Sequence, residues 1–123
     1  EFAADDYITN EYFTFDIDEI NDAYVFNWHD VIRTIVTNLA EGVKPGMISA
    51  KFHNTLAEVI VQIAGELKIN KVLLTGGCFM NKLLLERSLQ RLEEEGFKVY
   101  TQQRVPAGDG GISLGQMKYA SYL

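Results

Sequence analysis

Cysteine, proline and long apolar runs are scarce in this sequence of 123 residues. The single cysteine, Cys78, excludes a disulfide framework and a cysteine-based zinc site within the chain. Two prolines and ten glycines are too few for a low-complexity linker. No apolar run approaches the roughly 20 residues that a membrane span needs, and no signal peptide opens the chain, so we expect no membrane partner.

Basic residues are missing from the first quarter of the chain. Residues 1–32 hold nine acidic side chains and no Lys or Arg, whereas residues 33–123 hold eight acids and all eleven bases. The net charge of −6 disfavours nucleic acid as a partner. The acidic start is typical of a solvated segment, with an acidic docking surface as the alternative. We predict an acidic lead-in with a strand or hairpin over residues 1–27, distinct from residues 28–123.

Alternation and helical periodicity predict the individual elements. A strand is expected over residues 12–17, a turn over 18–22 and a returning strand over 23–26. Asn27 is expected to cap a helix that stops at Gly42, and Pro45 to begin a long helix that ends near Leu67. Further along, we expect a buried strand (71–75), a helix (82–95), a strand (97–101) and a last helix (112–122).

Residues 71–101 form a predicted strand–helix–strand unit, which is nearly always parallel and right-handed. The carboxyl ends of both strands then lie at one edge of the sheet, where open α/β sheets bind ligands. Two loops follow these strands, and they hold half of the ten glycines: Gly76, Gly77, Gly108, Gly110 and Gly111. The pattern predicts an α/β fold with a nucleotide-like cleft lined by glycine.

Three positions in these loops each have two interpretations. Gly76 and Gly77 either let backbone N–H groups approach a phosphate at a helix N-terminus or simply form a tight turn. Asn81 either hydrogen-bonds a nucleoside or caps the following helix, and the spacing favours the cap. Asp109 either binds a hard metal ion or caps the last helix, with the two interpretations evenly balanced.

Other reactive side chains are expected to be structural. Cys78 is expected to be a small buried hydrophobic residue. We expect His53 to be a packing residue of the long helix and His29 to lie on the surface. The two histidines belong to different helices and form no local pair of metal ligands.

Three ordered motifs resemble one known family. They are Phe52–Ala57 (FHNTLA), Thr75–Arg87 (TGGCFMNKLLLER) and Val105–Gln116 (VPAGDGGISLGQ). Together they resemble the C-terminal end of the HypF carbamoyltransferases, which act in the maturation of NiFe-hydrogenases. The resemblance implies that residues 28–123 are the C-terminal lobe of an actin-like, sugar-kinase or Hsp70 ATPase-type domain in a longer protein. Such a lobe has a ribonuclease H-like sheet and is similar to the tRNA threonylcarbamoyl transferases.

The resemblance also implies a cytoplasmic enzyme that uses carbamoyl phosphate and ATP. An upstream part of such a protein makes carbamoyl-adenylate, and this domain passes the carbamoyl group to the C-terminal cysteine of HypE. The thiocarbamate formed is later dehydrated and supplies the cyanide ligands of the hydrogenase iron. The alternatives are the ATP-binding lobe of a sugar-kinase-like phosphotransferase and a non-catalytic nucleotide-binding module.

By the same resemblance, individual residues receive roles. Gly76, Gly77 and Gly110 would bind the nucleotide, Asn81 would hydrogen-bond the nucleoside, and Asp109 would be a ligand of a divalent metal ion, iron or zinc. The metal site also needs a His-x-x-x-His pair, which this chain lacks and which the rest of the HypF chain would supply. We therefore expect this fragment to be inactive by itself, and self-association through an exposed lobe face is plausible.

The sequence departs from the family pattern at two positions. Gly108 stands where Asn is more frequent, and Met80 where Gln is more frequent. Both adjoin residues to which the resemblance gives a role.

Overall fold

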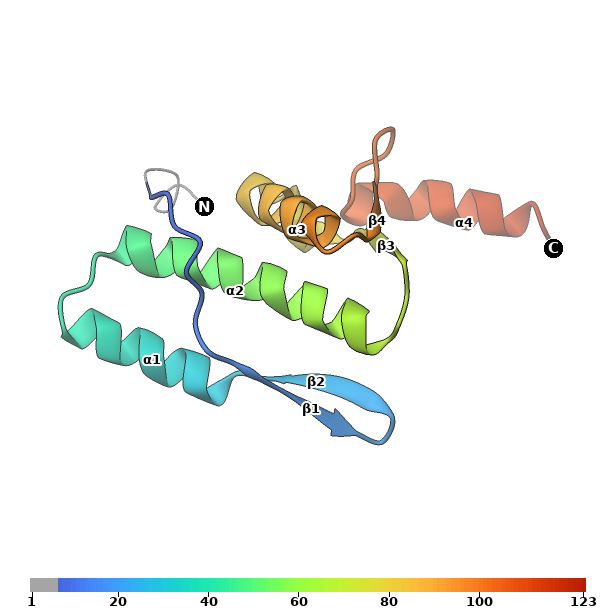
Figure 1. The fold of residues 1–123 in the computed structure, drawn as a ribbon. Helices are drawn as coiled ribbons and strands as arrows, with labels where there is room; N and C mark the ends of the chain where they lie inside the picture. The colour runs from blue at the N-terminus through green and yellow to red at the C-terminus, as the bar shows by residue number, and fades with distance from the viewer. Residues whose placement is uncertain (1–6) are drawn as a thin grey trace.

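The computed structural model describes residues 7–123. Figure 1 shows the elements in chain order, from an N-terminal hairpin through two antiparallel helices to a parallel strand pair and a projecting C-terminal helix. Short 3₁₀ turns, Gly77–Met80 and Asp109–Gly111, precede the last two helices. The helices and strands are β1 (Asp16–Ile20), β2 (Ala23–Asn27), α1 (His29–Ala40), α2 (Pro45–Glu66), β3 (Lys71–Leu74), α3 (Lys82–Glu94), β4 (Lys98–Thr101) and α4 (Ile112–Ala120).

The predicted N-terminal hairpin is present, but its first strand is shifted along the chain. β1 pairs antiparallel with β2, with Asp16 opposite Asn27. The turn is confined to Asn21 and Asp22, whose φ values of +52° and +61° are those of the tight turn that suits a hairpin. The strand predicted over residues 12–17 and the turn predicted over 18–22 are therefore wrong in their bounds.

The reason lies in α2, which binds the backbone that precedes β1. Asn54 Nδ2 donates to the carbonyl oxygens of Thr9 (2.7 Å) and Glu11 (2.9 Å). Thr55 Oγ1 accepts a hydrogen bond from the Phe13 N–H at 2.9 Å. Polar side chains of α2 thus bind backbone groups of a segment whose alternation predicts a strand. These groups need hydrogen-bond partners because they lie near the core, and the helix supplies them in place of a neighbouring strand.

Aromatic and aliphatic side chains join the hairpin to α1 and α2. Phe13, Val31 and Ile48 are buried there, with Phe26 packed against them. The predicted apolar stripe of α1 is only partly covered, since Trp28 and three aliphatic side chains of that stripe remain 46–60% exposed. The proposed boundary between residues 27 and 28 stays a prediction.

The ends of α1 and α2 agree with most of the expected signals. Asn27 is not the capping residue, because the helix begins one position later than predicted, yet its Oδ1 still accepts from the His29 N–H at 3.1 Å. Gly42 follows α1 with φ +79°, as expected of a glycine stop. Pro45 is the first residue of α2, as predicted.

The strand–helix–strand unit is confirmed. β3 pairs in parallel with β4, with Lys71 opposite Lys98. Ala64 of α2, Leu74 of β3 and Leu92 of α3 form the second buried cluster. The prediction of a fully buried strand is wrong for β3, because Leu73 is 59% exposed. Helices α2 and α3 contribute to the cluster from one face of the sheet, which explains why alternate strand residues remain open.

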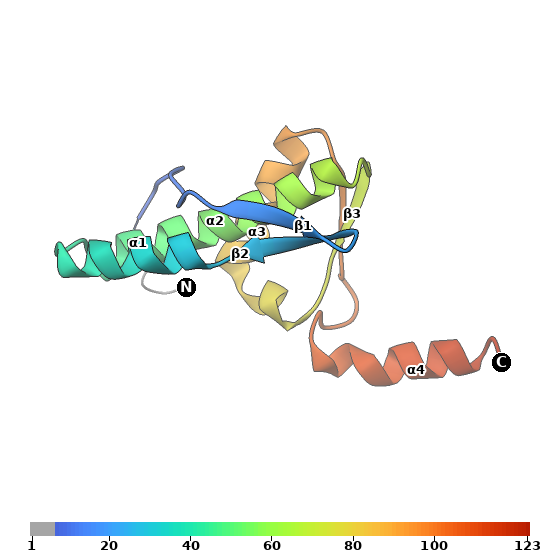
Figure 2. The ribbon, with the colours of Figure 1, turned by 90° about the horizontal axis from the view of Figure 1, so that it is seen from below.

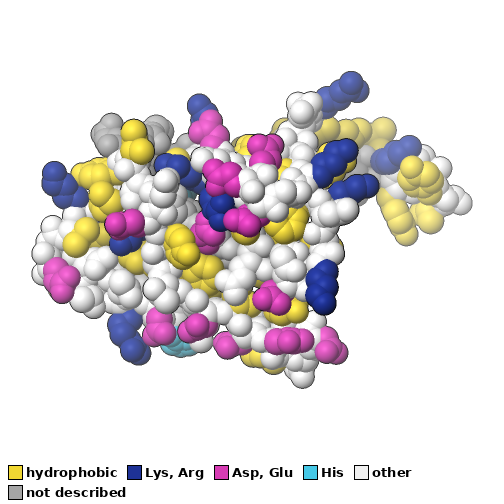
Figure 3. All heavy atoms as spheres, viewed as in Figure 1, with side chains coloured by type: hydrophobic (Ala, Val, Ile, Leu, Met, Phe, Trp, Pro, Cys, Tyr) yellow, Lys and Arg dark blue, Asp and Glu magenta, His cyan; other side chains and the backbone are white. Residues whose placement is uncertain are grey.

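The C-terminal helix α4 projects from the rest of the molecule, as Figures 1 and 2 both show. Its side chains include Leu114 and Met117, which are 52% and 71% exposed. Figure 3 shows hydrophobic side chains gathered on this projection, whereas acidic side chains line the edge of the molecule that the hairpin occupies. Among the described helices, none combines the length and apolar character that crossing a membrane requires.

Candidate functional site

The two glycine-rich loops meet at the carboxyl ends of β3 and β4, as the parallel topology predicts. The Gly76 N–H donates to the Ala107 carbonyl oxygen at 2.8 Å, which joins the first loop to the second. A Cβ atom at Gly108 would lie 3.6 Å from the Gly77 Cα and 3.1 Å from the Met80 sulfur. Gly108 and Met80, the two positions that depart from the family pattern, thus lie against each other.

The first loop has the features of an anion-binding turn. Gly76 has φ +100°, a conformation that residues with a Cβ adopt only with strain. A Cβ at Gly77 would meet nothing within 4 Å, so the surface beside it is open. Among residues 7–123, no partner accepts from the Gly77 and Cys78 N–H groups, which begin the 3₁₀ turn. Unpaired N–H groups on successive residues form a concavity that favours an anion.

Asn81 both caps α3 and reaches back to α2. Its Oδ1 accepts from the Leu84 N–H at 3.0 Å, which is the predicted cap. Its Nδ2 lies 2.9 Å from His53 Nε2, and the other ring nitrogen, Nδ1, lies 2.8 Å from the Ser49 carbonyl oxygen. His53 is only 7% exposed, in keeping with the expected packing role. The link between His53 and Asn81 has no signal in the sequence, because 28 residues separate the two positions.

Asp109 and the two glycines after it form the 3₁₀ turn of the second loop. Gly111, not Asp109, immediately precedes α4, so the helix-capping interpretation of Asp109 is wrong. Asp109 is exposed at the start of the 3₁₀ turn. A Cβ at Gly110 would lie 3.3 Å from the Pro106 ring, and a Cβ at Gly111 would lie 2.9 Å from the Pro106 carbonyl oxygen. Packing against Pro106 therefore accounts for Gly111, whereas a side chain at Gly110 would only be tight.

The part of the chain that the structure describes holds no cluster of three or more His, Cys, Asp or Glu side chains that could bind a metal ion. Asp109 fits such a site as one exposed carboxylate ligand, which hard cations accept readily. A site with three or more ligands of these types would need some of them from outside residues 7–123.

Of the remaining predictions, the one for Cys78 is wrong and the one for His29 is confirmed. Cys78 is exposed, so the expectation of a buried hydrophobic residue is wrong. Its neighbour Phe79 packs against the second cluster instead and turns the cysteine outward. His29 is exposed as predicted, with Nδ1 3.0 Å from Asn27 Oδ1.

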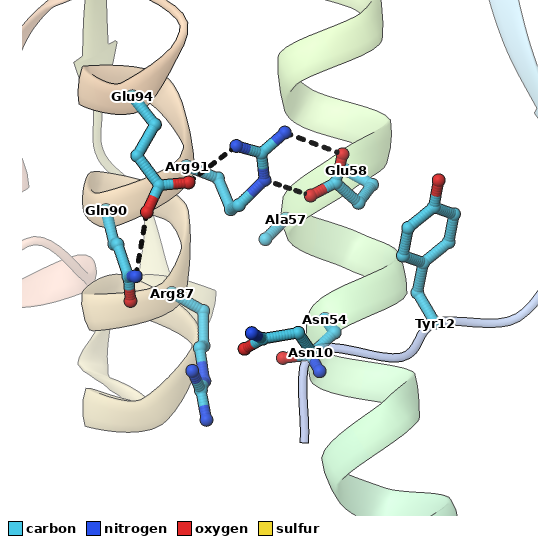
Figure 4. Close-up of a pocket in the computed structure, with 9 residues that line it drawn as sticks. All are labelled: Asn10, Tyr12, Asn54, Ala57, Glu58, Arg87, Gln90, Arg91 and Glu94. Atoms are coloured by element: carbon cyan, nitrogen blue, oxygen red, sulfur yellow. Dashed lines mark hydrogen bonds and ion pairs between the residues drawn. The ribbon is translucent and has the colours of Figure 1, made fainter. Parts of the chain in front are cut away.

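A second polar feature, a pocket between α2, α3 and the N-terminal segment, was not foreseen (Figure 4). Arg91 of α3 forms a two-pronged ion pair with Glu58 of α2 along one wall of this pocket. Arg91 also binds Glu94 at 2.7 Å and Glu95 at 2.9 Å. These last two partners lie three and four residues after Arg91, a spacing that the sequence displays.

Hydrogen bonds around Arg91 shift the pKa values of two side chains, Arg91 and Glu94. Hydrogen bonds from Arg91, first to Glu58 and then to Glu94 and Glu95, raise the pKa of Arg91 above its usual range. The pKa of Glu94 lies below its ordinary value, first because Gln90 donates a hydrogen bond to it and next because Arg91 does. Of these contacts, the ion pair between Arg91 and Glu58 joins the two helices and fastens α3 to α2.

The structure is an α/β lobe built on a parallel strand–helix–strand unit. Its two joined glycine loops lie at the carboxyl edge of the strands, which is where α/β folds of this class bind ligands. The family described as "Carbamoyltransferase, Kae1-like Domain, second subdomain" matches residues 1–116. The chain belongs to this family.

Relatives of known name agree with this assignment. The chain is 34% identical over 110 residues to the carbamoyltransferase HypF of Synechocystis sp., a match that covers 89% of this chain and 14% of that protein. It is 44% identical over 61 residues to a probable carbamoyltransferase HypF of Methanocaldococcus jannaschii, covering 50% of this chain and 8% of that one. The chain thus spans only a small part of the length of these relatives.

Solved structures confirm the predicted fold class. Full-length HypF in a phosphate- and nucleotide-bound form superposes with a TM-score of 0.83 and 40% identity, over 93% of this chain and 16% of that one. HypF of T. kodakarensis superposes with a TM-score of 0.71 over 98% of this chain and 16% of that one, at 22% identity, which speaks for the fold alone. The α/β lobe of a Kae1-like carbamoyltransferase domain is therefore the fold of this chain.

Proposed function

We propose that this chain is the nucleotide-binding lobe of a HypF carbamoyltransferase. Such an enzyme uses carbamoyl phosphate and ATP, by way of carbamoyl-adenylate, to carbamoylate the C-terminal cysteine of HypE, the step that leads to the cyanide ligands of NiFe-hydrogenases. The observation that carries the proposal is the joined pair of glycine loops, which present open N–H groups at the carboxyl edge of β3 and β4. A relative that was solved with phosphate and nucleotide bound supports it.

Each loop residue has a defined part in this proposal. The N–H groups at Gly77 and Cys78 face the adenylate phosphate, and the conformation of Gly76 keeps them in place. Asn81 hydrogen-bonds the nucleoside with the capacity that its cap and its contact with His53 leave free. Gly110 is assigned to the nucleotide through the family resemblance, and it also packs closely against Pro106.

The transfer itself balances simply. The sulfur of the acceptor cysteine forms a bond to the carbamoyl carbon, the bond from that carbon to the adenylate oxygen breaks, AMP leaves, and the thiol proton is released. The glycine loops would hold the phosphate on which negative charge develops. Asp109 would be one ligand of a divalent iron or zinc ion shared with a His-x-x-x-His pair outside this chain, and that ion would polarise the carbamoyl group.

Family membership favours carbamoyl transfer over phosphoryl transfer by a sugar-kinase-like lobe. The proposed partners are HypE and the rest of a HypF chain. The same proposal makes the 123-residue chain inactive by itself, and the exposed apolar side chains of α4 make self-association plausible.

The test uses the lobe joined to the remainder of a HypF polypeptide, with transfer of labelled carbamoyl to HypE as the measurement. Asp109→Asn should lower kcat by about 100-fold or more, the usual loss when one electrostatic stabiliser is removed. It should also release bound metal. Asp22→Asn, at the tip of the hairpin, is the matched control and should leave both unchanged. Full turnover and full metal content in Asp109→Asn would show that Asp109 has no such role.

A further inference from the structure

We infer that His53 is a positioning residue for the nucleotide site: it holds the Asn81 amide in the one orientation that both caps α3 and directs a free N–H toward a ligand. The inference rests on the proposed nucleotide-binding function and adds to it a residue on α2 that lies outside the glycine loops. It arises from two hydrogen bonds of one imidazole ring.

The partners of His53 fix which ring nitrogen carries the proton. The Ser49 carbonyl oxygen, 2.8 Å from Nδ1, can only accept, so Nδ1 must be the donor. In a neutral imidazole the other nitrogen, Nε2, is then an acceptor. The group that faces it at 2.9 Å must donate, and for Asn81 that group is the amide NH₂.

A separate contact gives the same orientation for Asn81. The Leu84 N–H donates to the other side-chain atom at 3.0 Å, which must therefore be the carbonyl oxygen. The two ends of the amide are thus assigned independently, and the assignments agree. A reversed amide would place its oxygen against the lone pair of Nε2 and its NH₂ against the Leu84 N–H, so that both contacts would be lost.

The locked amide retains hydrogen-bonding capacity for a ligand. An asparagine amide has two N–H donors and an oxygen with two lone pairs. His53 takes one donor and Leu84 takes one lone pair. One N–H and one lone pair remain, which is the combination that pairs with a hydroxyl group of a nucleoside. Because His53 is buried on the rigid helix α2, the orientation is set before any ligand arrives.

The deciding experiment compares two substitutions of His53 in this chain, with ADP as the probe and NMR titration as the measurement. Glutamine can place its Oε1 near the position of Nε2 and still accept from Asn81. Asparagine is too short to reach Asn81, although it can still donate to the Ser49 carbonyl. We expect His53→Asn to raise the Kd for ADP about fivefold, the effect of one ordinary hydrogen bond, and His53→Gln to restore affinity to within about twofold.

Substituting Asn81 as well as His53 completes a double-mutant cycle. In an Asn81→Ala background, which already lacks the amide, His53→Asn should weaken ADP binding no further. An unchanged Kd in His53→Asn, alongside weaker binding in Asn81→Ala, would overturn the positioning role and leave the proposed function standing. Failure of the wild-type lobe, joined to the remainder of a HypF polypeptide, to bind millimolar ADP would overturn both.

A second measurement needs no variant and no ligand. The ¹⁵N spectrum of the His53 ring in the wild-type chain reports which nitrogen carries the proton. We expect protonation at Nδ1. A ring protonated at Nε2 would face the Asn81 amide with a donor, and the inference would fail whatever the ADP titration gave.

Discussion

Helices α3 and α4 arise in the same way and end in opposite situations. Each follows a parallel strand, a glycine-rich loop and a 3₁₀ turn. Helix α3 buries Leu84, Ser88 and Leu92, and it faces α2 along its length. Helix α4 buries none of its side chains against residues 7–123. The comparison teaches that the glycine loop and turn suffice to launch a helix, whereas a second helix with matching apolar and charged groups is needed to hold it.

The comparison also extends to the caps. The side chain of Asn81 caps α3, and its amide lies against α2. The equivalent position before α4 is Gly111, where a Cβ would lie 2.9 Å from the Pro106 carbonyl oxygen. A capping side chain at Gly111 is therefore disfavoured by packing within the second loop, against Val105 and Pro106.

The largest expected difference between the helices concerns their leucines. Leu92 of α3 is completely buried, and Leu92→Ala should lower the free energy of unfolding by about 3 kcal/mol, through lost burial and a cavity. Leu114 of α4 is 52% exposed, and Leu114→Ala should change the same quantity by less than about 0.5 kcal/mol. Urea unfolding of both variants measures this, and equal losses would break the comparison.

An intermediate effect is expected where charge fastens α3 to α2. Arg91→Met would leave Glu58, whose side chain is only 16% exposed, without its partner. We expect a loss of about 2 kcal/mol in the free energy of unfolding. Arg33→Met is the control, because its pair with Asp30 at 3.8 Å is on the surface, and it should cost less than about 0.5 kcal/mol. Comparable losses in the two variants would contradict a fastening role for Arg91.

The smallest effect concerns pH at the end of α3. The pKa of Glu94 is lowered in the folded chain by hydrogen bonds from Gln90 and then Arg91, so its folded value lies below its unfolded value. Its stabilising contribution is then present above the unfolded value of about 4.3 and is lost as the pH falls through the lower folded value. Wild type should exceed Glu94→Gln in stability at neutral pH, and the two should converge in acid. Glu93→Gln, at the adjacent exposed position, is the control and should have the stability of the wild type at each pH. A stability difference between wild type and Glu94→Gln that grows as the pH falls would contradict the prediction.

The parts of the fold that could be predicted are those with local signals. Pro45 and the periodicity after it mark α2, and the glycines after β3 and α3 mark their ends. The start of β1 could not be predicted, because its position depends on a hydrogen bond between Phe13 and Thr55, which lie 42 residues apart. The outward turn of Cys78 depends in the same way on where Phe79 finds its packing partners.

In the candidate site, too, the features with local signals could be predicted and those that depend on distant contacts could not. Parallel topology predicts that the loops with Gly76 and Gly108 meet, and they do. The cap by Asn81 is a local signal, whereas its contact with His53 requires the packing of α2 on α3. The spacing of Arg91, Glu94 and Glu95 was a usable signal for half of the charged cluster, but Glu58, 33 residues before Arg91, was beyond it.

The hydrogen bond between Gly76 and Ala107 also has a consequence for motion. A loop that opens alone must leave a backbone donor or acceptor without its partner, so separate excursions of the two loops are disfavoured relative to a joint one. We therefore expect the two loops to open together more often than separately. A ligand that contacts only one loop should then also shift the population of the other.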